Sequence, residues 1–285
     1  MTSILDVADQ LQSRLSEMRR VIVAFSGGVD SSVVAAAAHA ANLELAVAAT
    51  ADSPSVPRWQ LDLAKSISRE IGIRHVIVAT DEGSRAEYQR NDTQRCFYCK
   101  QTLYDALSSI KLQLNDLSAV IVSGTNADDL GDHRPGIQAG KQADVETPLA
   151  DLGLTKSDVR ELAQHYHLSN HDLPASPCLA SRIAYGLEVT PQRLNRIEQA
   201  EDWLRAKGLT EFRVRLHPNE LARIEVHRES IVPLLQLDQQ GELTRHFKGL
   251  GFQFVTVDLE GFQSGSLNRM IVNIDLKPTS KEAVH

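Results

Sequence analysis

Apolar runs that alternate with helical segments constrain the fold of this chain more than any other feature. Val21–Phe25 is an uninterrupted apolar run, and strand-like segments follow at 45–50, 75–79 and 119–123. The stretches between them have the length and apolar spacing of helices, at about 31–41, 58–71 and 99–110. Strands that are buried on both faces and joined by helices form parallel sheets. We therefore predict an α/β fold with a doubly wound parallel sheet.

The pattern changes in the last third of the chain. A segment with Pro174 and Pro177 reads as a loop at 169–186, and a helix is expected at 191–207. Two short strands follow near 212–216 and 222–226. A chain of 285 residues can form two domains with separate cores. The prediction is a first domain at 1–185 and a smaller α+β domain at 186–285.

Composition and charge exclude several classes of protein. The net charge is -7, whereas a nucleic-acid surface usually needs a basic face. No stretch approaches the roughly 20 apolar residues of a membrane span, and the N-terminus has no apolar signal core. A cytoplasmic location without a membrane or nucleic-acid partner is expected. Three cysteines without an export signal suggest a metal site or a reactive thiol instead of disulfides.

The segment Ser26-Gly27-Gly28-Val29-Asp30-Ser31-Ser32 follows the first strand and precedes a helix. Two glycines let backbone N–H groups approach phosphate oxygens, the serines add hydroxyl donors, and the helix directs its positive end at the anion. A carboxylate would repel phosphate, so Asp30 is expected to hold Mg²⁺ that bridges the phosphates. A Walker A ending is absent. We predict a site for the pyrophosphate part of ATP.

A second group of candidates follows the fourth strand, at Gly124, Asp128 and Asp129. Ligands of parallel sheets bind beyond the carboxyl ends of the strands, which places these residues beside the glycine–serine loop. Asp128 and Asp129 are candidates to bind Mg²⁺, ATP or the substrate. The alternative is an Asp-rich turn whose carboxylates cap backbone N–H groups.

The loop resembles the PP-loop of the adenine nucleotide α-hydrolase superfamily. Those enzymes cleave ATP between its α and β phosphates and transfer AMP to an acceptor oxygen. The resemblance implies an AMP-forming enzyme that uses ATP and Mg²⁺. It also implies that adenine is held after the second strand, at Ala49 and Thr50.

Three further segments narrow the resemblance: 95–100 (RCFYCK), 124–129 (GTNADD) and 177–182 (PCLASR). Together they are similar to the LarE family of ATP-dependent sulfur transferases, over about residues 21–226. The resemblance implies a small nucleotide substrate, pyridinium-3,5-biscarboxylic acid mononucleotide. Its carboxylates would be adenylated and then converted to thiocarboxylates, for the nickel-pincer nucleotide cofactor of lactate racemase. It also implies a homo-oligomer.

Several charged residues are candidates to bind phosphates or the substrate. The basic ones are Lys100, Arg182, Arg213 and Arg215. The resemblance implies that Glu201 and Glu225 face the substrate together with the strand residues Arg213 and Arg215, which share one face because strands have a period of two. The alternative is a solvated face of paired charges.

The cysteines decide how sulfur is delivered. Cys178 lies after a proline and near Arg182, whose charge would stabilise a thiolate. In LarE proteins with that cysteine alone, it gives up its own sulfur and becomes dehydroalanine. Cys96 and Cys99 add two thiolates, and three thiolates suit a [4Fe–4S] cluster with one iron left open. A zinc site that recruits a histidine, such as His165 or His171, stays open as a third interpretation.

Other classes fit the sequence less well. A tRNA thiolase would carry a basic RNA-binding face, which the acidic charge disfavours. An ammonia-using synthetase would leave the three cysteines unexplained. An iron–sulfur carrier would leave the phosphate-binding loop without a purpose.

Overall fold

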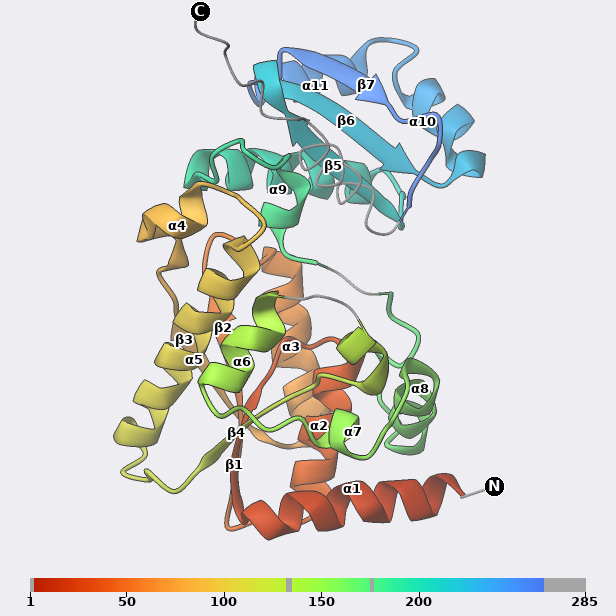
Figure 1. Cartoon of the computed structure of the whole chain (residues 1–285). Coiled ribbons are helices and arrows are strands. Elements are labelled where there is room, and N and C mark those ends of the chain that lie inside the picture. Colours follow the sequence, from red (N-terminus) through yellow and green to blue (C-terminus); the bar gives the residue numbers. More distant parts are fainter. Residues whose placement is uncertain (1–2, 132–134, 175–176, 264–285) are drawn as a thin grey trace, which may run out of the picture. The chain divides into compact units, whose positions relative to one another are not determined.

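The structure, a computed structural model, describes residues 3–131, 135–174 and 177–263 (Figure 1). It divides into two compact units. Unit 1 comprises Met1–Tyr88 and Gln94–Pro177, and unit 2 comprises Gln89–Thr93 and Cys178–His285. The domain boundary expected after residue 185 stays a prediction. It falls inside unit 2, a few residues after Cys178, where the second segment of that unit begins.

Unit 1 is built on a parallel sheet of four strands. These are β1 (Arg20–Ala24), β2 (Leu45–Asp52), β3 (Arg74–Ala79) and β4 (Val120–Ser123). Their order is β3-β2-β1-β4, and every neighbouring pair is parallel, with Ile22 opposite Val47 of β2 and Ile121 of β4. The predicted parallel sheet is confirmed.

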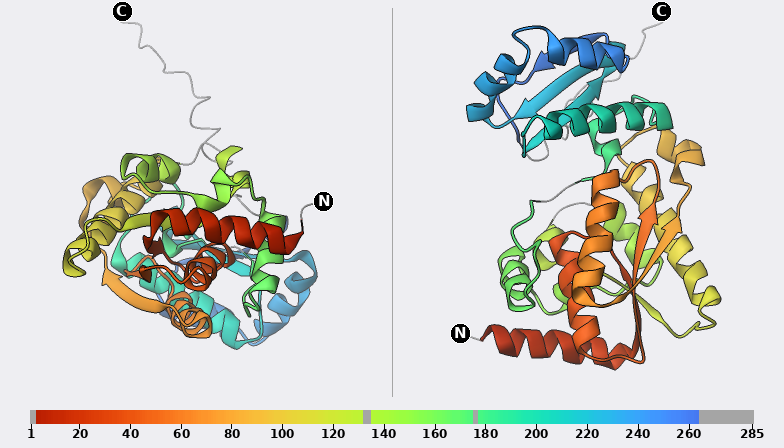
Figure 2. Two further views of the ribbon diagram at one scale, coloured as in Figure 1. Left: turned by 90° about the horizontal axis from the view of Figure 1, so that it is seen from below. Right: turned by 180° about the vertical axis from the view of Figure 1, so that it is seen from behind.

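Helices cover both faces of this sheet. One face is covered by α1 (Ile4–Met18), α2 (Val29–Ala40), α3 (Arg58–Ile71) and α8 (Lys156–His165). The other face is covered by α5 (Arg95–Gln113) and α6 (Pro135–Gln142) (Figures 1 and 2). Val21 and Val23 belong to the first core and Ile22 to the second, as the alternation of side chains along a strand requires. The central strand is therefore apolar on both sides, and the doubly wound fold is confirmed.

Short elements that the sequence pattern did not indicate complete unit 1. They are the helices α4 (Ala86–Gln89) and α7 (Pro148–Asp151) and the 3-10 turns η1 (Glu82–Ser84) and η2 (Ala127–Gly131). Thr155 begins α8 with a capping box, because its hydroxyl accepts from the Asp158 N–H while the Asp158 carboxylate accepts from the Thr155 N–H. α5 begins at Arg95, four residues before the predicted start. Cys96 and Cys99 therefore lie one turn apart on the same helix face.

The part of unit 2 that the structure describes holds a small mixed sheet and three helices. The helices are α9 (Pro191–Ala206), α10 (Ile231–Leu237) and α11 (Glu242–Gly249), and the strands are β5 (Phe212–His217), β6 (Leu221–Val226) and β7 (Phe254–Val257). In the sheet, β6 lies between antiparallel β5 and parallel β7. The unit also contains the 3-10 turns η3 (Leu179–Arg182), η4 (Pro218–Glu220) and η5 (Arg228–Ser230). The predicted smaller α+β region is confirmed.

The five residues 89–93 belong to unit 2 although both of their chain neighbours belong to unit 1. The Asn91 side chain is fully buried, and its Nδ2 donates to the carbonyl oxygens of Ala184 and Leu187, each at 2.8 Å. The Asn91 carbonyl oxygen accepts from the Gly186 N–H at 3.1 Å. Residues 89–93 thus supply hydrogen-bond partners to the backbone of residues 184–187. Within the described residues, no helix is long and apolar enough to cross a membrane.

Candidate active site

The glycine–serine loop lies at the point where the strand order of unit 1 reverses. From β1 the chain continues to β2 and β3 on one side, and β4 is added later on the other side. The loop after β1 and the segment 124–126 after β4 therefore leave the same edge of the sheet as neighbours. This is the position at which open α/β sheets bind their ligands.

Two glycines are required by close packing at this edge. Gly27 has a φ of +73°, and a Cβ atom on it would lie 2.8 Å from the Ala64 Cα. A Cβ atom on Gly124 would lie 2.6 Å from the backbone nitrogen of Ser31. Contacts this short exclude any side chain, so the first turn of α2 packs directly against the backbone that leaves β4.

The loop combines hydroxyl groups with backbone N–H groups that no side chain caps. The Ser31 Oγ donates to the Gly28 carbonyl oxygen at 3.0 Å, and the Ser26 and Ser31 hydroxyl oxygens lie 3.2 Å apart. Gly28 is the N-cap of α2 and has no side chain to satisfy the N–H groups of the first turn. These N–H groups and the helix dipole favour a phosphate group.

Ser32 lies differently from the other two serines. Its side chain is completely buried and its Oγ accepts from the Asn170 Nδ2 at 2.9 Å. A direct contact between Ser32 and phosphate stays a prediction. Asn170 was not predicted to belong to the site, because nothing in its local sequence indicates that it returns to the loop.

Asp30, the expected Mg²⁺ ligand, is half-buried and faces two donors. The Lys156 Nζ lies 2.5 Å from its Oδ2, and the Asn126 Nδ2 donates to its Oδ1 at 3.0 Å. The GTNADD segment at 124–129 contains Asn126 and could have indicated it as a site residue. The only local signal at Lys156 is its position as the first residue of the helix that Thr155 caps. The ammonium group shows that this carboxylate already attracts a cation.

Asp128 and Asp129 make the contacts of a capped turn. The Asp128 Oδ2 accepts from the backbone N–H of Lys156 at 2.8 Å, at the start of α8. The Asp129 Oδ2 accepts from the Asn126 N–H at 3.2 Å. These bonds correspond to the alternative interpretation of an Asp-rich turn, and they also place both carboxylates beside the loop that carries Asn126. Binding of ATP or substrate by Asp128 and Asp129 stays a prediction.

The residues expected to hold adenine are buried within β2. Ala49 belongs to the core, and its carbonyl oxygen accepts from the Phe25 N–H at 2.9 Å. The Thr50 hydroxyl lies 2.8 Å from the His75 Nε2. Burial lowers the pKa of His75, and the positive charges of Lys65 and Arg69 lower it further. Lys100 is exposed on α5, with its Nζ 6.0 Å from the centre of the Tyr104 ring.

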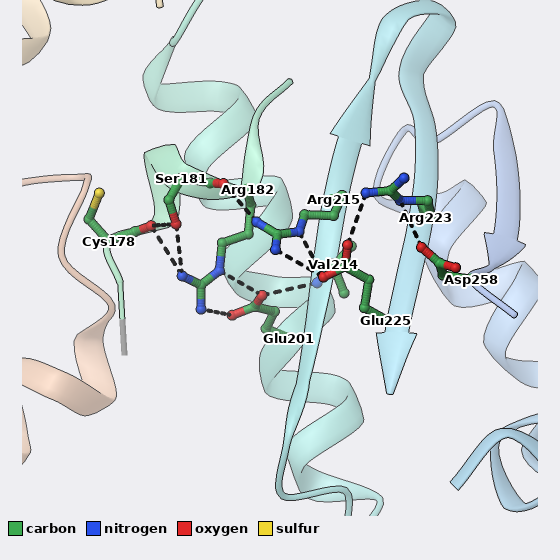
Figure 3. A network of polar contacts seen from close by, with 9 residues as sticks. All are labelled: Cys178, Ser181, Arg182, Glu201, Val214, Arg215, Arg223, Glu225 and Asp258. Carbon is green, nitrogen blue, oxygen red and sulfur yellow. Dashed lines mark hydrogen bonds and ion pairs between the residues drawn. The ribbon is translucent and has the colours of Figure 1, made fainter. Parts of the chain in front are cut away.

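In unit 2, buried ion pairs surround the turn that follows Cys178 (Figure 3). The Arg182 Nε donates to Glu201 at 3.0 Å, and its Nη1 donates to the Cys178 carbonyl oxygen at 3.2 Å. The Arg215 Nη1 donates to the Ser181 carbonyl oxygen at 2.8 Å. Two buried guanidinium groups therefore hold η3 and the residue before it by their carbonyl oxygens. The Cys178 sulfur points away from them (Figure 3).

Glu225 is the carboxylate at the centre of this network. It is fully buried and accepts from the Arg215 Nε at 3.0 Å and from the Arg223 Nη2 at 2.9 Å. The Arg223 Nε also lies 3.6 Å from the Asp258 carboxylate (Figure 3). Burial lowers the pKa of Arg215, although its hydrogen bond to Glu225 acts in the opposite direction.

Arg213 lies opposite Glu225 in the β5–β6 register and shares a face with Arg215, as predicted. Its side chain is only 6% exposed, and its guanidinium stacks 4.7 Å from the centre of the Phe262 ring. Burial, together with the charges of Arg215 and Arg182, lowers the pKa of Arg213 to about 10. No described carboxylate forms an ion pair with it, so its positive charge suits an anionic ligand.

The cysteines lie in both units. Cys96 is exposed and Cys99 half-buried on α5 of unit 1, and Cys178 is the half-buried residue before η3 of unit 2. None of the three forms a disulfide. The buried side chain of Arg95 lies beside Cys96, with its Nη2 3.8 Å from the sulfur. Among the described residues, no three histidine, cysteine or acidic side chains are grouped to hold a metal ion.

The parallel sheet with its glycine–serine loop defines an α/β protein of the PP-loop class. The family profile described as asparagine synthase matches residues 6–130, which contain this sheet and loop. The chain is also 33% identical to pyridinium-3,5-bisthiocarboxylic acid mononucleotide synthase of Lactiplantibacillus plantarum, over 93% of this chain and 95% of that protein. It therefore belongs to the LarE family of ATP-using enzymes.

Two uncharacterised proteins share the same full-length similarity. A protein of Synechocystis is 43% identical over 92% of this chain and 97% of its own length. A protein of Methanocaldococcus jannaschii is 28% identical over 90% of this chain and 96% of its own length. The similarity thus includes unit 2 and is not confined to the PP-loop unit.

Proposed function

We propose that this protein is an AMP-forming sulfur transferase acting on pyridinium-3,5-biscarboxylic acid mononucleotide. It would convert the two carboxylates to thiocarboxylates, in the biosynthesis of the nickel-pincer nucleotide cofactor of lactate racemase. The observation that carries the proposal is the similarity to the Lactiplantibacillus synthase over 95% of that protein's length. A PP-loop alone would support ATP cleavage, whereas similarity through unit 2 supports the same acceptor.

The first half-reaction uses the site of unit 1. A substrate carboxylate oxygen attacks the α-phosphorus of ATP, the bond to the bridging oxygen breaks, and pyrophosphate leaves. The Gly28 N–H, the first turn of α2 and the Ser26 and Ser31 hydroxyls hold the leaving phosphates. Lys156 can turn its ammonium group from Asp30 to these oxygens.

The residues at Asp30 fit Mg²⁺. Its carboxylate is partly exposed and already pairs with an ammonium group, and Mg²⁺ in nucleotide sites is typically bound by one or two carboxylates and the phosphates. The ion would supply positive charge to the pyrophosphate leaving group. Gly124 and Asp128 line the ATP side of this site, and Ala49 and Thr50 the adenine side, in the proposal.

The second half-reaction replaces oxygen by sulfur. A sulfur nucleophile attacks the acyl carbon of the mixed anhydride, the bond to the phosphate oxygen breaks, and AMP leaves with the original carboxylate oxygen. With sulfide as the nucleophile the product is the thiocarboxylate, and no oxidant or reductant is needed. Each substrate molecule passes through this sequence twice.

The thiols fit a [4Fe–4S] cluster by their chemistry. None is in a disulfide, Cys96 and Cys99 are one helical turn apart, and three thiolates leave the fourth iron open. A cluster held by Cys96, Cys99 and Cys178 would supply a sulfide at that iron. The alternative is that Cys178 attacks the acyl carbon itself. The resulting thioester then loses the Cys178 α-proton and its Cβ–S bond breaks, which leaves dehydroalanine.

Charged residues of both units are proposed to bind the substrate. Arg213 suits the phosphate of the mononucleotide, because it is buried, stacked on Phe262 and without a carboxylate partner among the described residues. Glu201 and Glu225 act through the arginines Arg182 and Arg215 that they orient. Lys100 and Asp129 are the candidates from unit 1.

The test is turnover of the anaerobically purified protein with ATP, Mg²⁺, sulfide and the biscarboxylic acid mononucleotide. The expected products are AMP, pyrophosphate and a nucleotide in which sulfur replaces oxygen. ATP cleavage that requires tRNA and gives no sulfur-containing nucleotide would contradict the proposal. Iron, sulfide and zinc analysis distinguishes the cysteine alternatives: absence of iron, with loss of one hydrogen sulfide from the protein mass, would establish sacrificial donation.

Asp30→Asn tests the phosphate site itself. It is expected to lower pyrophosphate release at least about 100-fold, because the Mg²⁺ ligand is lost while the side chain keeps its shape. The matched control is Asp62→Asn, which also removes an Asp–Lys pair, at 2.9 Å from Lys65 on the exposed face of α3. Its activity should stay within about twofold of wild type.

A further inference from the structure

Asn170 lies after α8 and reaches back to the phosphate-binding loop. Its side chain is 3% exposed, and its Nδ2 donates to the Gly27 carbonyl oxygen at 2.8 Å and to the Ser32 Oγ at 2.9 Å. Its Oδ1 has no hydrogen-bond partner among the described residues. The amide orientation is determined by Gly27, because exchanging the two atoms would place one carbonyl oxygen against another.

We infer that Asn170 is a positioning residue for the pyrophosphate-binding loop; the inference rests on the proposed use of this loop. In a trans peptide, the carbonyl oxygen and the next N–H point in opposite directions. By holding the Gly27 carbonyl oxygen inside the unit, Asn170 turns the Gly28 N–H outward. That N–H makes only a long bond, 3.3 Å to the Ser26 Oγ, and is available to an anion.

This peptide needs an external constraint because a glycine lies on each side of it. Glycine backbones adopt both signs of φ at little cost, so the plane between Gly27 and Gly28 can turn over. The packing of Gly27 on Ala64 fixes its position but does not select the direction of its carbonyl group. The bond from Asn170 selects that direction, and its second bond, to Ser32, ties the loop to α2.

Asn170 can impose this direction because its own segment is anchored. The neighbouring Ser169 donates from its backbone nitrogen and from its Oγ to the Glu70 carboxylate on α3, at 2.7 and 2.6 Å. The Asn170 carbonyl oxygen accepts from the Leu173 N–H at 3.0 Å. The segment is therefore held by Glu70 on one side of Asn170 and by Leu173 on the other.

The decisive variant is Asn170→Asp, which keeps the shape of the side chain and removes both N–H donors. The Ser32 hydroxyl can rotate and donate to the new carboxylate, but the Gly27 carbonyl oxygen can only be repelled. The peptide then turns over, and the Gly28 N–H faces inward. The Kd for Mg²⁺-pyrophosphate, measured by titration calorimetry on the full chain, should rise at least about tenfold, as expected for one lost charge-assisted hydrogen bond.

Asn170→Ala separates this effect from the added negative charge and decides the question if the Asp variant does not fold. It should raise the KM for ATP about tenfold and change kcat less, because a contact to the bound phosphates is lost. Asp172→Asn is the control, since it changes an exposed side chain of the same segment that pairs with His171 at 3.1 Å, and it should leave the Kd within about twofold of wild type.

Wild-type affinity in both Asn170 variants would overturn the inference and leave the proposed function intact. A wild-type protein that binds no pyrophosphate would overturn both.

Discussion

Glu225→Gln tests whether the arginine network of unit 2 is truly desolvated. The carboxylate is fully buried and accepts from the Nε and Nη2 of Arg215, at 3.0 and 2.9 Å, and from the Nη2 of Arg223 at 2.9 Å. A hydrogen bond to a charged group contributes roughly 1.5–3 kcal/mol. The glutamine keeps the shape and one acceptor, but it compensates neither guanidinium charge.

The expected loss is about 3–5 kcal/mol in the free energy of unfolding of unit 2, the range measured when one partner of a buried ion pair is removed. That is a large share of the roughly 5–15 kcal/mol that stabilise a domain. The chain has two tryptophans, Trp59 on α3 of unit 1 and Trp203 on α9 of unit 2. In a Trp59→Phe background, Trp203 fluorescence during urea unfolding reports on unit 2 alone.

Glu220→Gln provides the matched control. Glu220 also pairs with two arginines, Arg193 and Arg196, but its side chain is 29% exposed. Water can therefore solvate the two guanidinium groups when the negative charge of Glu220 is removed. The expected loss in the free energy of unfolding is within about 1 kcal/mol. If Glu225→Gln destabilised unit 2 no more than Glu220→Gln, the reasoning from desolvation would be refuted.

Three further outcomes follow from single contacts. Gly124→Ala should lower pyrophosphate affinity, measured by calorimetry, because a Cβ 2.6 Å from the Ser31 nitrogen must displace the first turn of α2. The control is Gly153→Ala, at a glycine with a φ of +68° but open space around its Cβ, which should not lower this affinity. The lowered pKa of His75 means that the unfolded chain binds its proton at a higher pH than the folded one. Stability of unit 1 should therefore fall as the pH drops below about 6.5, and His75→Gln should flatten this dependence in urea unfolding at pH 5–7. Arg213→Met should leave unit 2 as stable as wild type or more so, because it removes a buried charge repelled by Arg215 and Arg182, but inorganic phosphate should then no longer raise its unfolding midpoint.

The sheet and the phosphate loop could be predicted because their signals are local. A strand buried on both faces, such as Val21–Phe25, is a continuous apolar run, and the two glycines and the serines of the loop follow it directly. Parallel strands all end at the same edge, which predicts Gly124 on the same side of the sheet as the loop, whereas its place directly beside the loop depends on the pairing of β4 with β1.

The remaining site residues depend on contacts between distant segments. Lys156 reaches Asp30, and Asn170 reaches Gly27, across more than a hundred residues of chain. No spacing rule connects such pairs. The burial of Arg213, Arg215 and Glu225 was also beyond the sequence pattern, because alternating charged residues usually mark a solvated strand face, and only tertiary packing decides that these are covered.

The insertion of residues 89–93 has a consequence for how unit 2 can be produced. A fragment that begins at Cys178 would lack Asn91, so the Leu187 carbonyl oxygen would lose the Asn91 Nδ2 donor and the Ala184 carbonyl oxygen would keep only the Leu187 N–H. During synthesis, residues 89–93 leave the ribosome long before the rest of unit 2 exists. We therefore expect a fragment that begins at Cys178 to be less stable than unit 2 in the full chain, and to regain stability when residues 89–93 are supplied as a peptide.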